Sequence, residues 1–253
     1  MNPPLTTCLA FDTATEHLSI ALQVGDRLWS HEAAGGALAS STLIPGVMDL
    51  LAQAGIGLRE LDAVAFGRGP GAFTGLRTAC SVAQGLAFGV GKPVLPIDTL
   101  LTVAQDARDL CSGNPLDDVW VAMDARMGEI YAAHAVFGVD GWRLATAPWL
   151  CTPQQLNERW RVAAPRAVAG TALSAFGDLL DCGQALCLPQ ALPCARAMLP
   201  LARALWAQGG AVEAAQALPL YLRDKVALTT SERTAERAAA KALAESTAAE
   251  VPT

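Results

Sequence analysis

The chain has 253 residues, of which 52% are hydrophobic and 17% charged, so it can bury a sizeable core and lacks the composition of a disordered chain. Its net charge is −6, with 24 acidic and 18 basic residues, which argues against independent tight binding of nucleic acid, because such binders usually carry a basic surface. The longest uncharged runs, 33–48 and 78–91, are shorter than the roughly 18–20 apolar residues of a membrane-spanning helix.

Neither the N-terminus nor the cysteines indicate an exported protein. Residues 1–15 show no basic region followed by an apolar one, as a signal peptide would. The seven cysteines are odd in number and form no C-x-x-C pair, which favours buried, reduced thiols over a disulfide framework or a metal site. We therefore expect a cytoplasmic protein without a transmembrane segment.

The first part of the chain predicts a mixed α/β lobe over residues 1–112. Apolar patterning predicts strands over 7–11, 18–24, 27–32, 63–66 and 94–97, and helices over 42–54 and 73–88. The resulting order, β-β-β-α-β-α-β, is typical of a sheet with mixed strand pairing and helices packed on it.

A second lobe is expected over residues 113–228, with its last helix able to pack back on the first lobe. Its predicted elements are strands over 119–123, 130–137, 143–148 and 167–169, helices over 154–161, 172–181 and 197–208, and a loop over 182–194. Residues 229–253 are rich in Ala, Glu, Thr and Ser, which predicts a frayed helix or a flexible tail.

Polar side chains follow the first predicted strand at Asp12, Thr13 and Thr15. A carboxylate and hydroxyls at such a turn could face a phosphate or its metal. They could also bond their own backbone in an Asx or ST turn, and the residue types favour this second interpretation.

A glycine-dense loop, 67–71, lies between a predicted strand and a predicted helix. It is not a G-x-x-x-x-G-K-[ST] loop, because Leu76 follows Gly75, and it is not G-x-G-x-x-G, because position 72 is alanine. Free N–H groups at the helix N-terminus could bind an anion, or the glycines could serve a tight turn between strand and helix. Both interpretations stay open.

Small residues form one stripe of the helix that follows this loop, at Thr74, Thr78, Ser81 and Gly85. Such a stripe allows a second helix to come close, so this helix and the 42–54 helix could form a surface for a partner. The alternative, that both faces of the helix are internal, stays open.

The second lobe offers one further cluster, Asp124-Ala125-Arg126 with Glu129. These residues could be catalytic, but an ion pair that fixes a turn is the favoured interpretation, and Asp98 is similarly ambiguous. The three histidines are isolated, so neither an H-E-x-x-H zinc site nor a nucleophile triad is indicated.

Five segments together resemble a known family. They read LAFDTAT (9–15), GRGPGAFTGLR (67–77), AQGLA (83–87), DARMGEIY (124–131) and YLR (221–223). The sequence resembles, over about residues 5–226, the bacterial TsaB (YeaZ) family, the dimerisation subunits of the tRNA threonylcarbamoyladenosine machinery. This resemblance implies an α/β protein with an actin-like ATPase (sugar kinase/Hsp70/actin) fold, in which two related lobes have mixed sheets flanked by helices.

The resemblance also implies that the chain has no catalytic residues, no metal and no cofactor. The family's catalytic relative, TsaD, carries a metal-binding His-x-x-x-His where this sequence has Thr99 and Val103. The glycine-rich second phosphate loop of active actin-like ATPases is replaced here by 124–127. Remnants of the nucleotide and phosphate loops are then expected, at Asp12, Thr13, Gly69 and Gly71.

The resemblance implies pairing with a TsaD-like subunit through the two helices, followed by docking of a TsaE-like ATPase. Transfer-RNA that reads codons beginning with A would be contacted only through the complex, and the chain alone would form a homodimer. The expected partner-binding residues are Leu43, Ile44, Val47, Leu50, Leu51, Thr74, Arg77, Thr78, Ser81 and Gly85. A charge at Val47 or Ala79 is expected to weaken pairing.

Two rival functions remain. A stand-alone ATPase or small-molecule kinase would need a phosphate loop in the second lobe, which is missing, and an adenosine-binding glycine pair, for which Gly170-Thr171 is a poor candidate. A metalloprotease would need the metal-binding histidines that this sequence lacks.

Overall fold

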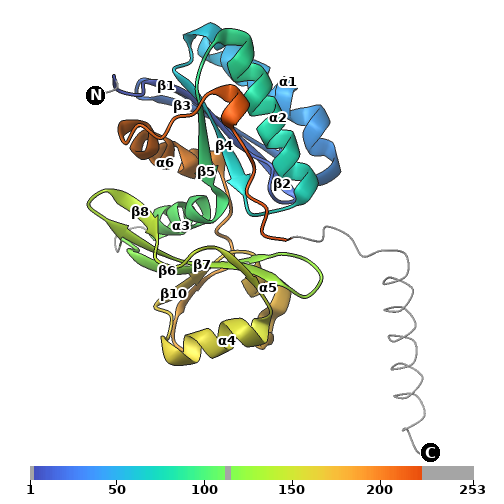
Figure 1. Ribbon diagram of the computed structural model, residues 1–253, viewed down its shortest axis with the longest axis vertical. Helices are drawn as coiled ribbons and strands as arrows, with labels where there is room; N and C mark the ends of the chain where they lie inside the picture. Colours follow the sequence, from blue (N-terminus) through green and yellow to red (C-terminus); the bar gives the residue numbers. More distant parts are fainter. Residues whose placement is uncertain (1–2, 112–114, 224–253) are drawn as a thin grey trace, which may run out of the picture. The chain divides into compact units, whose positions relative to one another are not determined.

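The computed structural model describes residues 3–111 and 115–223, and the chain up to Leu222 forms one compact unit (Figure 1). Its framework consists of two β-sheets. The first is ordered β3-β2-β1-β4-β5. Its strands are β1 (Thr7–Asp12), β2 (His17–Val24), β3 (Arg27–Ala34), β4 (Ala63–Gly69) and β5 (Val94–Asp98).

The second sheet repeats this order of strands. It runs β8-β7-β6-β10-β11, so its first three strands again form an antiparallel meander and the last two again add in parallel. Its strands are β6 (Asp118–Asp124), β7 (Ile130–Gly138), β8 (Gly141–Leu144), β10 (Ala167–Ala169) and β11 (Leu186–Leu188), and β9 (Trp149–Cys151) pairs with β7. The predicted pair of related lobes with mixed sheets is present.

Helices cover both faces of the first sheet (Figure 1). One face carries α1 (Ala39–Ala54) and α2 (Phe73–Val90), and the other carries α3 (Thr99–Leu110) and α6 (Ala195–Ala207). The second sheet carries α4 (Pro153–Val162) and α5 (Ala172–Phe176) on its outer face. Short 3₁₀ turns are η1 (Gly36–Leu38), η2 (Leu58–Glu60), η3 (Gly177–Leu179) and η4 (Ala214–Gln216).

The first sheet has a separate hydrophobic core on each face, because side chains alternate along its strands. In β1, Leu9 and Phe11 pack beneath α1 and α2, whereas Cys8 and Ala10 face the opposite side, because successive side chains point to opposite faces of a sheet. That opposite side shares one core with the inner face of the second sheet, which includes Val121. Helices α3 and α6 therefore lie in a core common to both sheets.

Several predicted elements differ from the structure. The helix α3 was not expected, nor were two three-residue strands: β9, which follows the predicted strand 143–148, and β11, which lies in the predicted loop 182–194. The strand predicted over 143–148 is β8, which ends at Leu144. The helix predicted over 172–181 ends at Phe176, because Gly177 has a φ of +51°, outside the helical range.

The described chain ends by returning to the first sheet. Val212 forms a bridge with Val94 of β5, and the Leu220 N–H donates to the Arg68 carbonyl at 2.7 Å. Together with α6, this segment belongs spatially to the first sheet although it follows the second. The division of the chain near residue 112 stays a prediction, and the predicted tail 229–253 lies outside the described residues.

Helix α1 is amphipathic. The segment Gly36–Ala54 is the one helix of the described residues that is long and apolar enough, by length and composition, to cross a membrane. Six residues of α1 are buried within the protein: Ala39, Leu43, Gly46, Val47, Leu50 and Leu51. Its apolar character thus follows from its packing on the first sheet.

Candidate functional site

The turn after β1 is held by its own side chains. The Ala14 N–H donates to Asp12 Oδ1 at 2.7 Å, which makes the Asx turn favoured by the residue types. The Thr99 hydroxyl donates to Asp12 Oδ2 at 3.1 Å, and the Thr13 hydroxyl donates to the Gly75 carbonyl at 2.7 Å. The polar groups of this turn are therefore engaged within the protein.

Burial dominates the ionisation of Asp12. It raises the pKa of the Asp12 carboxyl to about 6, although the hydrogen bonds from Ala14 and Thr99 act in the opposite direction. The charge of Glu32 raises it further. Asp12 therefore titrates near neutral pH while fully enclosed.

The glycines of the 67–75 region lie directly against this turn. A Cβ atom on Gly67 would lie 1.7 Å from Asp12 Oδ2, and one on Gly71 would lie 2.6 Å from the Ala14 Cβ. Gly69 has a φ of +114°, and its Cβ would lie 2.7 Å from the Leu220 carbonyl. These contacts are those of a tight turn, in which protein atoms fill the space beside the glycines.

One donor at the N-terminus of α2 is likewise bound by the chain. The Ala72 N–H donates to the Ala14 carbonyl at 2.8 Å, so one of the donors that could hold an anion is already used. The structure therefore favours the tight turn over the anion site. The assignment of Asp12, Thr13, Gly69 and Gly71 as remnants of nucleotide and phosphate loops stays a prediction.

The two positions that match the relative's metal-binding histidines have structural roles here. The Thr99 hydroxyl is held between Asp12 and the Gly69 N–H, which donates to it at 3.1 Å, and Val103 is fully buried in the core between the sheets. Over residues 3–111 and 115–223, no three His, Cys, Asp or Glu side chains gather as metal ligands would. Neither position offers an imidazole, the ligand that the relative's motif supplies.

The loop after β6 is fixed by charged groups. Arg126 donates its backbone N–H to Asp124 Oδ1 at 2.8 Å and its guanidinium to Oδ2 at 3.2 Å, which confirms the predicted ion pair. The same guanidinium reaches Glu16 at 3.0 Å, in the turn between β1 and β2. Arg126 and Met127 have φ values of +62° and +56°, a backbone conformation usual for glycine, so the loop keeps the shape of a glycine turn with bulky side chains.

The Gly170-Thr171 pair is also explained by packing. A Cβ on Gly170 would lie 2.5 Å from the Ala122 carbonyl of β6, and the Thr171 hydroxyl accepts a hydrogen bond from the Asp124 N–H at 3.0 Å. These two residues therefore connect β10 to β6, and neither contact requires an adenosine.

Four predicted partner-binding residues are wrong as surface residues. Leu43, Val47, Leu50 and Leu51 are buried beneath α1 in the core of the first lobe. Their spacing marks the face of α1 that packs on the sheet, and a partner could not reach it. The same holds for the test substitution at Ala79, which is fully buried under α2.

The other six predicted residues lie outward or partly so. Ile44 is 46% exposed, and Thr74, Arg77, Ser81 and Gly85 are exposed along α2. Thr78 is half-buried, and its hydroxyl donates to the Thr74 carbonyl at 3.0 Å. The interpretation in which both faces of α2 are internal is therefore wrong, while their role in partner binding stays a prediction.

Three exposed apolar side chains, in η1, α1 and α2, were missed. Leu38 is 56% exposed, Met48 48% and Phe88 80%. Met48 lies four residues after Ile44, so the i, i+4 spacing on α1 was the available signal. We define the α1/α2 outer face by these residues: Leu38, Ile44, Met48, Thr74, Arg77, Ser81, Gly85 and Phe88.

Two glycines of α2 have no role in the packing of the described protein. A Cβ atom on Gly85 or Gly89 would meet no described atom within 4 Å. Glycine inside a helix costs about 1 kcal/mol relative to alanine. The protein thus carries a destabilising residue type on its outer face without an internal steric reason for it.

The cysteines are all free. Cys8, Cys80 and Cys151 are buried, and burial raises the pKa of the Cys8 and Cys151 thiols to about 12. The predicted burial is confirmed for these three thiols. It is wrong for Cys187, which is exposed on the edge strand β11.

Two lobes that repeat one strand order and carry helices on their outer faces define the actin-like ATPase fold. Comparison with known proteins narrows this class. Residues 38–231 match the family model described as "TsaD: tRNA N6-adenosine threonylcarbamoyltransferase".

Two relatives named "tRNA threonylcarbamoyladenosine biosynthesis protein TsaB" match most of the chain. The Haemophilus influenzae protein is 38% identical, covering 87% of this chain and 94% of its own, and the Escherichia coli protein is 36% identical, covering 87% and 95%. The structure of YeaZ from Pseudomonas aeruginosa superposes with a TM-score of 0.77 at 40% identity, covering 86% of this chain and all of that one. The chain belongs to the family that the TsaD model describes and, within it, to the TsaB (YeaZ) proteins.

Proposed function

We propose that the chain acts in tRNA threonylcarbamoyladenosine formation as a non-catalytic subunit that pairs with a TsaD-like transferase. Family membership supports the pathway, because the relatives that match along most of their length are named as biosynthesis proteins of this modification. The α1/α2 outer face supports a docking role.

The observation that carries this proposal is the composition of that outer face. Exposed Ile44, Met48 and Phe88 lie on helices that hold one charged residue each, Asp49 in α1 and Arg77 in α2. Large exposed apolar patches mark interaction sites on soluble proteins, and small residues such as Gly85 allow a partner helix to approach closely. A partner that covers this face would explain both features.

The absence of catalysis is inferred from how the chain uses its own polar groups. Atoms of the Asp12 turn occupy the space beside the glycines of the 67–71 loop, and the Thr99 hydroxyl donates to Asp12. A stand-alone ATPase or kinase would need donors and space for phosphates there. The contacts of the loops thus favour the accessory role over the rival enzymatic one.

The remaining parts of the proposal follow from pairing. A TsaE-like ATPase docks on the pair in the cytoplasm, and tRNA is held mainly by the partners, since the net charge of −6 disfavours strong phosphate binding by this chain. Without its partner, the chain covers the same face by forming a homodimer of C2 symmetry.

The test is complex formation with the cognate TsaD-like subunit, measured by size-exclusion chromatography with light scattering. The double variant Ile44→Glu/Phe88→Glu places charges on the outer face, and we expect at least tenfold weaker pairing because those charges would be buried without partners. The matched control is Val162→Glu, since Val162 is 91% exposed on α4 of the second lobe. Undiminished pairing of the double variant, or equal losses in both proteins, would contradict the docking site.

A further inference from the structure

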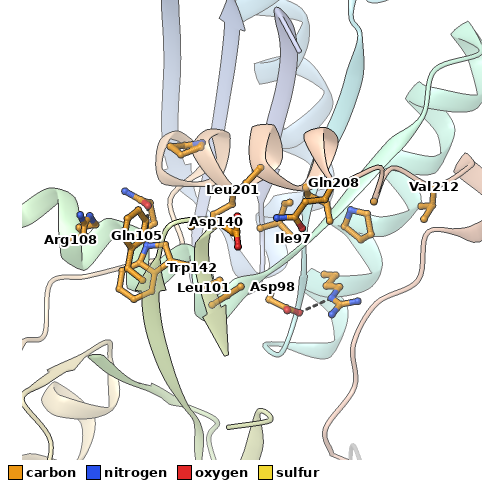
Figure 2. A pocket seen from close by; sticks show the side chains of 18 residues that line it. Ile97, Asp98, Leu101, Gln105, Arg108, Asp140, Trp142, Leu201, Gln208 and Val212 are labelled. Atoms are coloured by element: carbon orange, nitrogen blue, oxygen red, sulfur yellow. Dashed lines mark hydrogen bonds and ion pairs between the residues drawn. The ribbon is translucent and has the colours of Figure 1, made fainter. Parts of the chain in front are cut away.

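A cavity of about 610 Å³ lies between α3, the β7–β8 hairpin, α6 and the edge strand β5, which Val212 bridges (Figure 2). Leu101, Gln105 and Arg108 of α3 line it. Thr99, which bonds to Asp12, does not, whereas Arg68 of the glycine-dense loop 67–71 does, so the cavity borders that loop but not the Asp12 turn. Its volume is within the range of sites for small organic ligands.

The floor of the cavity is apolar. Ile97 and Leu201 are buried in the core between the sheets, and Phe137 and Trp142 meet edge to face at a centroid distance of 5.3 Å. The Trp142 indole N–H donates to Gln105 Oε1 at 3.0 Å, which fixes the orientation of its ring. The cavity therefore presents a preformed aromatic and aliphatic surface to an occupant.

One carboxylate that lines the cavity has no ion pair within the described protein, whereas the other charged side chains of the lining do. Arg68 pairs with Asp98 at 2.6 Å. Arg108 pairs with Asp117 and lies over the Phe137 ring at 3.9 Å. Asp140, in the β7–β8 turn, makes no side-chain hydrogen bond or ion pair with any described residue. Of the four charged residues that line the cavity, two cationic and two anionic, Asp140 is therefore the one without an ion pair to a described residue.

A second polar side chain, that of Gln208, also lines the cavity. Figure 2 shows the Asp140 carboxylate and the Gln208 amide of the α6 C-terminus both directed into the cavity. The Gln208 side chain is likewise without a hydrogen bond to the described protein. The Gln208 carbonyl oxygen can accept a hydrogen bond from an N–H of a bound ligand that does not point at Asp140.

We propose that this cavity binds an amphiphilic organic cation. The apolar body of the ligand lies on Phe137 and Trp142, and its protonated amine donates hydrogen bonds to Asp140 and Gln208. A carboxylate ligand of the same shape would meet Asp140 as a like charge, and the nearby guanidiniums are already paired. This site shares no residue with the α1/α2 outer face, so it stands independently of the proposed partner.

The first test compares tryptamine with indole-3-propionate, which has the same ring and a carboxylate in place of the amine. Isothermal titration of the full chain should show saturable binding of tryptamine at least tenfold tighter than that of the anion. In ¹H–¹⁵N spectra, tryptamine should shift the Trp142 indole N–H signal. Equal affinities, or no saturation by either probe, would overturn the proposal.

Variants then locate the site. Asp140→Asn should remove the preference for the cation, whereas Val139→Asn, a change at a fully exposed neighbour in the same turn, should keep it. Ala204→Trp places an indole into the cavity from α6 and should abolish binding of both probes. Tryptamine binding that survives both Asp140→Asn and Ala204→Trp would contradict the assignment.

Discussion

The outer helices of the two lobes occupy matching places on sheets of the same strand order, yet they differ in character. In the first lobe, α1 and α2 have 16 and 18 residues and one charged side chain each. In the second, α4 and α5 have 10 and 5 residues, and α4 alone carries Glu158, Arg159 and Arg161.

The second-lobe helix α4 has the features of a solvent-facing helix. Thr152 and Gln155 form a capping box at its N-terminus, and Arg159 lies over the Trp149 ring at 5.6 Å. Helices α1 and α2 have no side-chain cap and expose Phe88 and Met48 instead. This difference in charge and capping supports the docking face proposed on the first lobe.

The largest expected effect separates the two faces of α1. Val47→Glu would bury a charge in the core of the first lobe and should lower the free energy of unfolding by more than about 4 kcal/mol. Ile44→Glu, one turn away on the outer face, should change it by about 0.5 kcal/mol or less. Denaturant titration of both variants measures this, and similar losses would show that the two faces are misassigned.

Gly75→Ala tests the close packing of α2 on the Asp12 turn. Its Cβ would lie 1.9 Å from the Thr13 carbonyl oxygen, a backbone atom that cannot rotate away. We expect a loss of about 3 kcal/mol in the free energy of unfolding, measured by denaturant titration. An unchanged stability would mean that the turn and the helix are less tightly packed than described.

The buried carboxyl in the same turn predicts a pH dependence. Because the folded-state pKa of Asp12 is raised from 3.8 to about 6, its stabilising contribution is complete below about pH 4 and is lost as pH rises through about 6. That difference corresponds to about 3 kcal/mol. Asp12→Asn should therefore gain stability relative to the original chain between pH 4 and pH 7, and a constant difference over this range would contradict the raised pKa.

The smallest expected effect, that of Gly85→Ala, tests the docking role of the α1/α2 outer face most specifically. Gly85→Ala removes the cost of a helical glycine and, since no described atom opposes the new Cβ, should stabilise the chain alone by about 1 kcal/mol. The same methyl group should weaken pairing with the TsaD-like subunit if a helix packs closely there. A thermal melt and a binding titration on one variant measure both, and a gain in stability with undiminished pairing would remove the reason for the glycine.

The sequence predicted most of the framework because alternation and helical periodicity are local signals. The apolar run 7–11 predicted the strand that is β1, and the apolar spacing over 42–54 predicted the helix that is α1. The helix α3 was missed because it starts directly after β5 without a side-chain cap, so its β-branched Thr102 and Val103 continue the apolar run of the strand. The strands β9 and β11 are too short for alternation to show.

The site was less predictable because its decisive contacts join distant parts of the chain. An amphipathic helix has one apolar face, and Val47 could have faced a sheet or a partner; only the packing decides. The glycines of 67–75 were recognised, but Asp12 and Ala14, which fill the space beside them, come from another strand. The cavity at Asp140 likewise combines side chains of α3, β8 and α6, which no local pattern connects.

The most direct test of the central claim is reconstituted tRNA modification with the TsaD-like and TsaE-like subunits and the enzyme that makes threonylcarbamoyl-adenylate, with and without this chain. We predict that modification requires the chain, that Ile44→Glu/Phe88→Glu abolishes this support while Val162→Glu retains it, and that the chain alone hydrolyses no ATP. Modification that proceeds without the chain, together with ATP turnover by the chain alone, would contradict the account and favour an actin-like-fold kinase or ATPase.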